Sequence, residues 1–189
     1  MESICGRAGF SRGAFYSNFE SKEQLFLALL EREFEQRAAD LAAKAVELSH
    51  ELRGQETCFT PDEAARYVAD FLAPSSDHTK WFVLETEFLL LAMRDPSLAL
   101  GHHEFMEQFY ANIAGIVEQI ITAARRRFTI PIERALPVLS SVYERALRSC
   151  ALDGEHSGAF IELGERIAEL VFALTEPIEV DGERVRGGV

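Results

Sequence analysis

Residues 8–26 of the 189-residue chain read AGFSRGAFYSNFESKEQLF, and this stretch decides how the fold is interpreted. We expect Gly9 to occupy a tight turn, because glycine adopts positive φ angles without penalty. Ser11 is a preferred N-cap residue, so a short helix is predicted to begin after it. In that helix Phe15 and Phe19 share one face, which we expect to pack inward. The segment is therefore predicted to fold as helix, turn and helix.

The opposite side of the second helix carries little bulk. Gly13 and Ser17 lie away from the aromatic face, Tyr16 lies on a flank, and Arg12 lies in the first turn. Lys22 stands at the start of the next helix, whose partly positive N-terminus favours phosphate. A small, polar ridge of this kind is typical of a helix-turn-helix reader, whose second helix enters the major groove of DNA.

These residues resemble the DNA-binding signature of TetR/AcrR-type bacterial transcriptional regulators. The family pattern, A-G-apolar-S-x-G-x-aromatic-Y-x-x-F-x-S-K-E-x-L, is met from Ala8 to Leu25. A match of this length at fixed spacing is specific, unlike a lone short motif. The resemblance implies an all-α, TetR-like fold, with an N-terminal helix-turn-helix followed by a helical bundle for ligand binding and dimerisation.

The resemblance also implies which residues contact DNA. Three groups are implied: residues facing bases (Arg12, Gly13 and Ser17), residues touching the DNA backbone (Tyr16, Asn18 and Lys22), and Ser11, which caps the helix and reaches a phosphate. The function implied is a ligand-responsive regulator, a repressor, that binds a palindromic operator in double-stranded DNA as a homodimer.

One departure from the family pattern concerns the beginning of the chain. The family normally has another helix before this motif, packed across both helix-turn-helix elements, whereas Met1 falls inside the first helix of the motif. We therefore expect four apolar side chains to lack cover: Ile4, Phe15, Phe19 and Phe26. Exposing such side chains costs about 1.5–3 kcal/mol each, so a loosened DNA-binding region and weak or absent operator binding are expected. The alternative function is a helical ligand-binding and dimerisation module that has lost DNA binding with its first helix.

Nearly every segment after the motif shows helical periodicity. We expect helices over residues 21–53, 61–73, 77–94, 96–128, 131–152 and 157–176, and no strand. The run from Arg125 to Arg127 is interpreted as the cationic end of the long fourth helix of this series. The predicted domains are a helix-turn-helix head with the start of a connecting helix (1–45), a ligand-binding and dimerisation domain (46–176) and a mobile tail (177–189).

Composition limits the other functions. The net charge of −12 argues against non-specific binding to polyanions, but residues 1–22 carry a slight positive excess, so any DNA contact belongs there.

His102 and His103 point about 100° apart on a helix and cannot both ligate a metal from one face, so they are interpreted as solvated and no metal or cofactor is predicted. No catalytic motif is present, which predicts a protein that is not an enzyme. No segment predicts membrane insertion, and three scattered cysteines favour the cytoplasm.

Two further surfaces are predicted beyond the motif. Aromatic and polar residues of the middle helices are candidates for binding a small apolar or aromatic effector: Tyr67, Phe71, Trp81, Glu85, Phe88, Phe105, Phe109 and Tyr143. For each of them, core packing is an alternative that the sequence leaves open. Apolar stripes of the last two helices are candidates for closing a four-helix bundle across a two-fold axis: Leu136, Leu139, Val142, Ile167, Leu170, Val171 and Leu174. Packing within one subunit is the alternative there.

Overall fold

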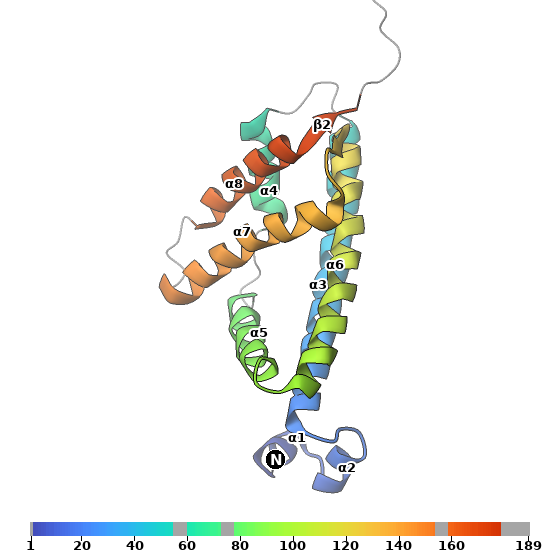
Figure 1. The fold of residues 1–189 in the computed structure, drawn as a ribbon, viewed down its shortest axis with the longest axis vertical. Helices are drawn as coiled ribbons and strands as arrows, with labels where there is room; N and C mark the ends of the chain where they lie inside the picture. Colours follow the sequence, from blue (N-terminus) through green and yellow to red (C-terminus); the bar gives the residue numbers. More distant parts are fainter. Residues whose placement is uncertain (1, 55–59, 73–77, 154–158, 179–189) are drawn as a thin grey trace, which may run out of the picture. The chain divides into compact units, whose positions relative to one another are not determined.

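The computed structural model describes residues 2–54, 60–72, 78–153 and 159–178. The described chain is helical apart from one short two-stranded sheet, which confirms the predicted all-α class (Figure 1). The elements are α1 (Glu2–Ala8), α2 (Arg12–Tyr16), α3 (Lys22–Arg53), α4 (Pro61–Leu72), α5 (His78–Ala92), α6 (Pro96–Ala123), β1 (Arg126–Phe128), α7 (Ile132–Asp153), α8 (Ala159–Leu174) and β2 (Thr175–Pro177).

The chain divides into two units by its internal contacts. The first unit joins Met1–Leu41 to Pro74–Ile113, and the second joins Ala42–Ala73 to Ala114–Val189. The divisions fall within α3 and within α6. The domain bounds at residues 45 and 176 stay predictions. The sequence did not predict that α5 and most of α6 belong with the N-terminal segment.

The core of the first unit lies where the start of α3 meets α5 and α6. Leu30 of α3 and Phe88 of α5 have no exposed surface, and Ala92 is 4% exposed. The ring of Phe26 meets that of Phe88 edge-on, with centroids 5.3 Å apart. Gly101 permits α6 to approach α3, because a Cβ there would lie 3.0 Å from Cδ2 of Leu27.

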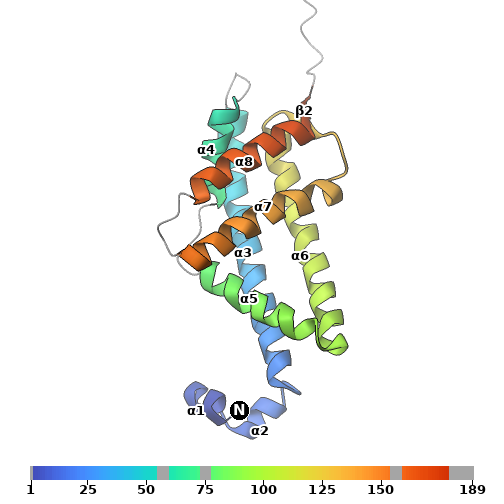
Figure 2. The same ribbon diagram turned by 60° about the vertical axis from the view of Figure 1, so that its left-hand side comes forward.

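The second unit is built around a close crossing of α4 and α8, which the two views of the ribbon show (Figures 1 and 2). A Cβ at Gly164 of α8 would lie 2.5 Å from the carbonyl oxygen of Ala65 and 2.9 Å from Cβ of Ala69. Only glycine fits so close to another backbone. Next to this crossing, Leu139 of α7 and Leu163 of α8 belong to the buried cluster of the unit.

The arginine run does not form a helix end, so that interpretation was wrong. Helix α6 ends at Ala123, Arg125 takes a left-handed φ of 56°, and Arg126–Phe128 pairs antiparallel with β2. Side-chain contacts explain the strand. Arg126 donates from Nε to Thr175 Oγ1 (2.7 Å) and lies 4.4 Å from the Phe172 ring centroid.

The tail predicted over 177–189 begins with ordered residues. Pro177 belongs to β2, and the amide of Ile178 donates to the carbonyl of Arg125 at 2.8 Å. Residues 179–189 lie outside the described part of the chain. Among the helices that are described, none has both the length and the apolar character that crossing a bilayer requires.

Candidate nucleic-acid interface

The helix-turn-helix segment consists of α1, the turn at Gly9 and Phe10, and α2. Gly9 has a φ of 72°, as its place in a tight turn predicts. The amide of Phe10 donates to the carbonyl of Cys5 at 2.9 Å, which closes the end of α1. Ser11 is the N-cap of α2, since its Oγ accepts a hydrogen bond from the amide of Ala14 at 3.1 Å. The local sequence therefore sets both helix ends.

The aromatic face of α2 points inward. Phe15 is 8% exposed, and its ring centroid lies 5.7 Å from that of the half-buried Phe19. Cys5 of α1 is 5% exposed, so its small side chain lies inside the segment. This packing fixes which side of α2 remains in water.

The other side of α2 is exposed and mainly hydrophilic. Arg12, Gly13 and Ser17 are exposed, and Tyr16 is 52% exposed while its ring meets Phe15 edge-on. A Cβ at Gly13 would meet only Ser11 Oγ, at 3.7 Å. The five-residue helix therefore offers a low ridge, flanked by longer side chains, to a partner outside the chain.

Several of these polar side chains have partners within the segment. Arg12 forms an ion pair with Glu2 at 3.1 Å, and both side chains are largely exposed. Ser17 Oγ donates to the carbonyl of Ala14 at 2.9 Å, and Asn18 Nδ2 donates to the same carbonyl at 2.8 Å. Exposed ion pairs contribute at most about 1 kcal/mol, so Arg12 can exchange Glu2 for an external acceptor.

The start of α3 presents Lys22 beside a capped helix end. Ser21 Oγ accepts from the amide of Gln24 (3.1 Å), and Gln24 Oε1 accepts from the amide of Glu20 (2.6 Å). The pair thus resembles a capping box, with the reciprocal bond one residue earlier. The Lys22 side chain is 69% exposed and lies 3.5 Å from Glu23, which leaves its ammonium open to a phosphate.

The expectation that four apolar side chains lack cover was wrong for two of them. Phe15 is buried, with its ring beside that of Phe19, and Phe26 is half-buried against Phe88 of α5, a contact between residues far apart in sequence. Phe19 is half-buried, and Ile4 is 44% exposed. Phe10, in the turn, is 67% exposed.

Comparison with known proteins agrees with this geometry. Residues 1–29 match the model of the family described as bacterial regulatory proteins, tetR family. This N-terminal segment is similar in sequence to the tetR family. The match supports a DNA-binding transcriptional regulator and points to a non-enzymatic protein. The matched residues include all of α1 and α2 and the exposed Lys22.

A solved structure shares the fold over most of the chain. It is described as a TetR-family transcriptional regulator from Mesorhizobium loti MAFF303099, and it superposes with a TM-score of 0.67 at 18% sequence identity. The alignment covers 92% of this chain and 85% of that one. A search of curated proteins gives no match.

The predicted effector-binding residues divide between the two units. In the first unit, Phe88 is fully buried in the core, and the half-buried Phe105 and Phe109 meet Phe34 of α3, with ring centroids 5.2 and 4.8 Å away. The other first-unit candidates, both half-buried, are Trp81 and Glu85. Phe88 thus packs as core, whereas Phe105 and Phe109 keep part of their surface open.

In the second unit, Tyr67 donates its hydroxyl to Glu51 Oε1 at 2.8 Å. Phe71 is half-buried and its carbonyl accepts from Lys44 Nζ at 3.4 Å, while Tyr143 packs against the buried cluster of α7 and α8. These three residues are held by contacts inside this unit. A hollow of about 430 Å³ in the same unit has other, mainly polar lining residues: Arg53, Gly115, Glu118, Gln119, Thr122, Ala123 and Arg125.

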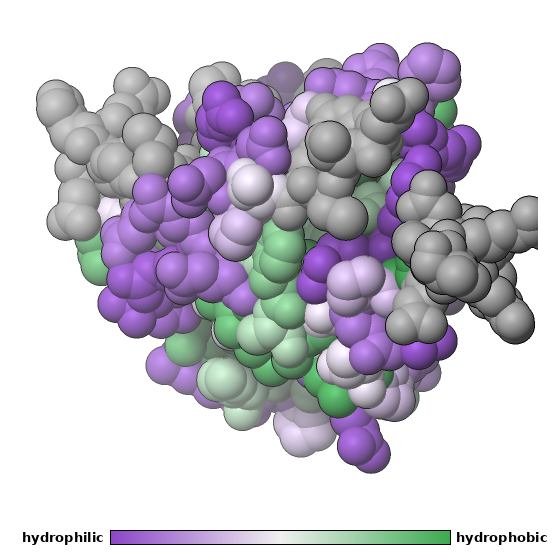
Figure 3. Space-filling model, turned by 90° about the horizontal axis from the view of Figure 1, so that it is seen from above, coloured by the Kyte–Doolittle hydropathy of each residue, from purple (hydrophilic) through white to green (hydrophobic). Residues whose placement is uncertain are grey.

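The predicted dimer residues differ in burial. Leu136, Leu139 and Ile167 are 5–7% exposed and pack within the subunit. The half-buried remainder is Val142, Leu170, Val171 and Leu174. Large apolar side chains exposed elsewhere in this unit are Val46, Val138, Leu152 and Ile178. Seen from above, hydrophobic side chains gather between hydrophilic areas of the surface (Figure 3).

Sequence reasoning missed two groups buried in the first unit. His102, interpreted as solvated, is half-buried and stacks on Phe88 with centroids 5.8 Å apart, and burial lowers its pKa, with a smaller contribution from His103. Arg37 of α3 lies over the Phe34 ring, 5.0 Å from its centroid, with only 14% of its side chain exposed. His102 lies one helical turn before Phe105 on α6, and that spacing was the available signal for it, whereas Arg37 follows Glu33 by four residues, a spacing typical of an exposed ion pair.

Proposed function

We propose that this chain is a ligand-responsive repressor that binds a palindromic operator as a homodimer in the cytoplasm. The observation that carries the proposal is the orientation of α2. Phe15 is buried, so Arg12, Gly13 and Ser17 line the side of the helix that faces water. A helix with this exposed edge enters the major groove, where an arginine can donate two hydrogen bonds to guanine.

Phosphate contacts are proposed for the flanks of the ridge. Tyr16 and Lys22 are exposed on either side of the α2–α3 turn, and Ser11 and Asn18 mark the two ends of α2. Such contacts fix the register of the helix on the duplex and carry no sequence information. They should therefore strengthen binding to every sequence equally.

Dimerisation is proposed through α7 and α8. The support is the set of half-buried apolar residues on these helices, Val142, Leu170, Val171 and Leu174, together with exposed Val138. Two such helices per subunit close a four-helix bundle around a two-fold axis. The dimer then presents two α2 helices to two half-sites, which accounts for a palindromic operator.

The effector is proposed to bind the aromatic part of the first unit. It releases DNA only if it binds the DNA-free arrangement more tightly than the DNA-bound one. Phe105 and Phe109 of α6 are the candidates that combine ring contacts with partly open surface.

The test begins with selection of binding sequences from a pool of random duplex DNA. We expect recovered sites to be palindromic and the complex to contain two chains. Lys22→Ala should weaken binding to all duplexes and reduce the salt slope by about one, whereas Arg12→Ala should relax base preference. If no duplex is enriched over several rounds, the regulator proposal fails and the alternative, a ligand-binding module without DNA binding, is favoured.

A further inference from the structure

The buried guanidinium of Arg37 has an unfilled hydrogen-bonding edge. Its Nε and Nη2 atoms are shielded from solvent and have no hydrogen-bond acceptor among the residues that the structure describes. These two nitrogens lie on the same edge of the planar group, so their N–H bonds point in nearly the same direction. This is the fork that receives the two oxygens of a carboxylate.

A buried donor without an acceptor is costly, so it calls for an explanation. Glu33 Oε1 lies 3.4 Å from Nε, but without hydrogen-bond geometry, and its side chain is 25% exposed. Glu33 therefore balances part of the charge of Arg37 without filling the fork. It also has room to turn toward solvent.

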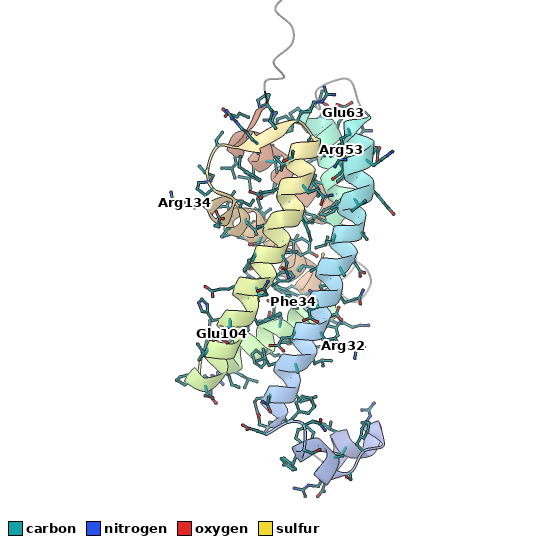
Figure 4. All side chains as sticks on the ribbon, turned by 90° about the vertical axis from the view of Figure 1, so that its right-hand side faces the viewer. Arg32, Phe34, Arg53, Glu63, Glu104 and Arg134 are labelled. Carbon is teal, nitrogen blue, oxygen red and sulfur yellow. The ribbon has the colours of Figure 1, made fainter. Side chains whose placement is uncertain are left out.

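The surroundings of the fork are aromatic. Arg37 lies over Phe34, which is 4% exposed and is contacted by Phe105 and Phe109 of α6. Figure 4 shows Phe34 between α3 and α6, while Arg32 points outward from α3. A second shielded atom, His102 Nε2, also has no hydrogen-bond partner in the described part of the chain, and its residue lies one helical turn before Phe105.

We propose that the Nε–Nη2 edge of Arg37 binds the carboxylate of an organic acid whose apolar body lies against Phe105 and Phe109. The proposal rests on the proposed ligand-responsive function, and it names the chemical class of the effector. A single carboxylate fits better than a phosphate, because the more highly charged group would meet Glu33 and the apolar rings at greater cost.

The experiment uses non-absorbing acids, cyclohexanecarboxylate and octanoate, and their neutral amides. Binding is followed by the melting temperature and by the fluorescence of Trp81, the one tryptophan of the chain, which packs on the core of the first unit. We expect the acids, and not the amides, to raise the melting temperature and change the fluorescence.

Three variants locate the binding. Arg37→Met should keep the fold, with a melting temperature equal to or above that of the wild type because an unsatisfied buried cation is removed, yet bind the acids at least tenfold more weakly. Arg32→Met, the matched control on the exposed side of α3, should bind them as the wild type does. Glu33→Gln should bind them more tightly, because a competing carboxylate is gone. If Arg37→Met does not fold, Arg37→Lys, which keeps the charge but lacks the fork, should show the weakened binding.

The inference is overturned if neither acid affects the wild type, if the amides act equally, or if Arg37→Met retains the acid response. Its failure is distinct from failure of the proposed function. A chain that selects DNA sites without any acid response contradicts only the carboxylate inference. A chain that binds acids through Arg37 but selects no DNA contradicts the regulator proposal.

Discussion

Replacing Gly164 by alanine tests the close crossing of α4 and α8. In an exposed helix interior, Gly→Ala stabilises by about 0.5–1 kcal/mol, because alanine loses less conformational freedom on folding. At Gly164 the added Cβ would lie 2.5 Å from the carbonyl oxygen of Ala65, a backbone atom that cannot turn away. One of the two helices must therefore move.

The magnitude follows from the opposing terms. Forcing an extra carbon into a close-packed contact costs about 1–3 kcal/mol, which exceeds the gain in helix propensity. We expect Gly164→Ala to lower the free energy of unfolding by about 1–2 kcal/mol. The matched control is Gly115→Ala in α6 of the same unit, where nothing lies within 4 Å of the new Cβ.

Urea denaturation followed by circular dichroism measures both variants. The control should raise the free energy of unfolding by about 0.5–1 kcal/mol, so the same substitution has opposite signs at two helical glycines. Stabilisation by Gly164→Ala similar to that of the control would show that α4 and α8 do not cross as closely as described.

The remaining stability predictions use the same denaturation assay. Phe88→Ala should lower the free energy of unfolding by about 3–5 kcal/mol, while Met93→Ala, at a side chain 71% exposed, should change it by less than about 0.5 kcal/mol; similar effects would contradict the core assignment. Ser11→Ala should cost about 1 kcal/mol through loss of the α2 cap, and no change would mean that the cap is not formed. Burial lowers the pKa of His102, so the folded state favours the neutral imidazole. The unfolded chain therefore binds a proton more readily, and the free energy of unfolding is highest above about pH 6.5 and declines below it. His102→Gln should lose less unfolding free energy between about pH 7 and pH 5 than the wild type does. An equal loss in the two proteins would show that His102 does not cause this pH dependence.

The local features of the fold could be predicted from sequence because each depends on neighbouring residues. Gly9 at positive φ, the Ser11 cap and the inward Phe15 depend on steps of one to four residues, and the structure contains all three. Helix periodicity similarly predicted α4 and α7 to within a few residues.

What could not be predicted depends on contacts between distant residues. No local pattern indicates that Phe88 covers Phe26, or that Thr175 draws Arg126 into a strand. Arg37 is a further case, because its burial follows from how α3 packs in the first unit. An arginine one helical turn after a glutamate is typical of an exposed ion pair, and the sequence alone would assign it to the surface.

The most direct test of the central claim is duplex binding by Gly13→Trp. The structure leaves space for a side chain at Gly13, since a Cβ there meets only Ser11 Oγ at 3.7 Å, so the variant should melt like the wild type. If the exposed face of α2 lies against DNA, the added ring prevents that approach, and fluorescence anisotropy with a selected duplex should show at least about tenfold weaker binding, or roughly 1.4 kcal/mol. Wild-type affinity in a normally folded Gly13→Trp would contradict the claim that this face of α2 reads DNA.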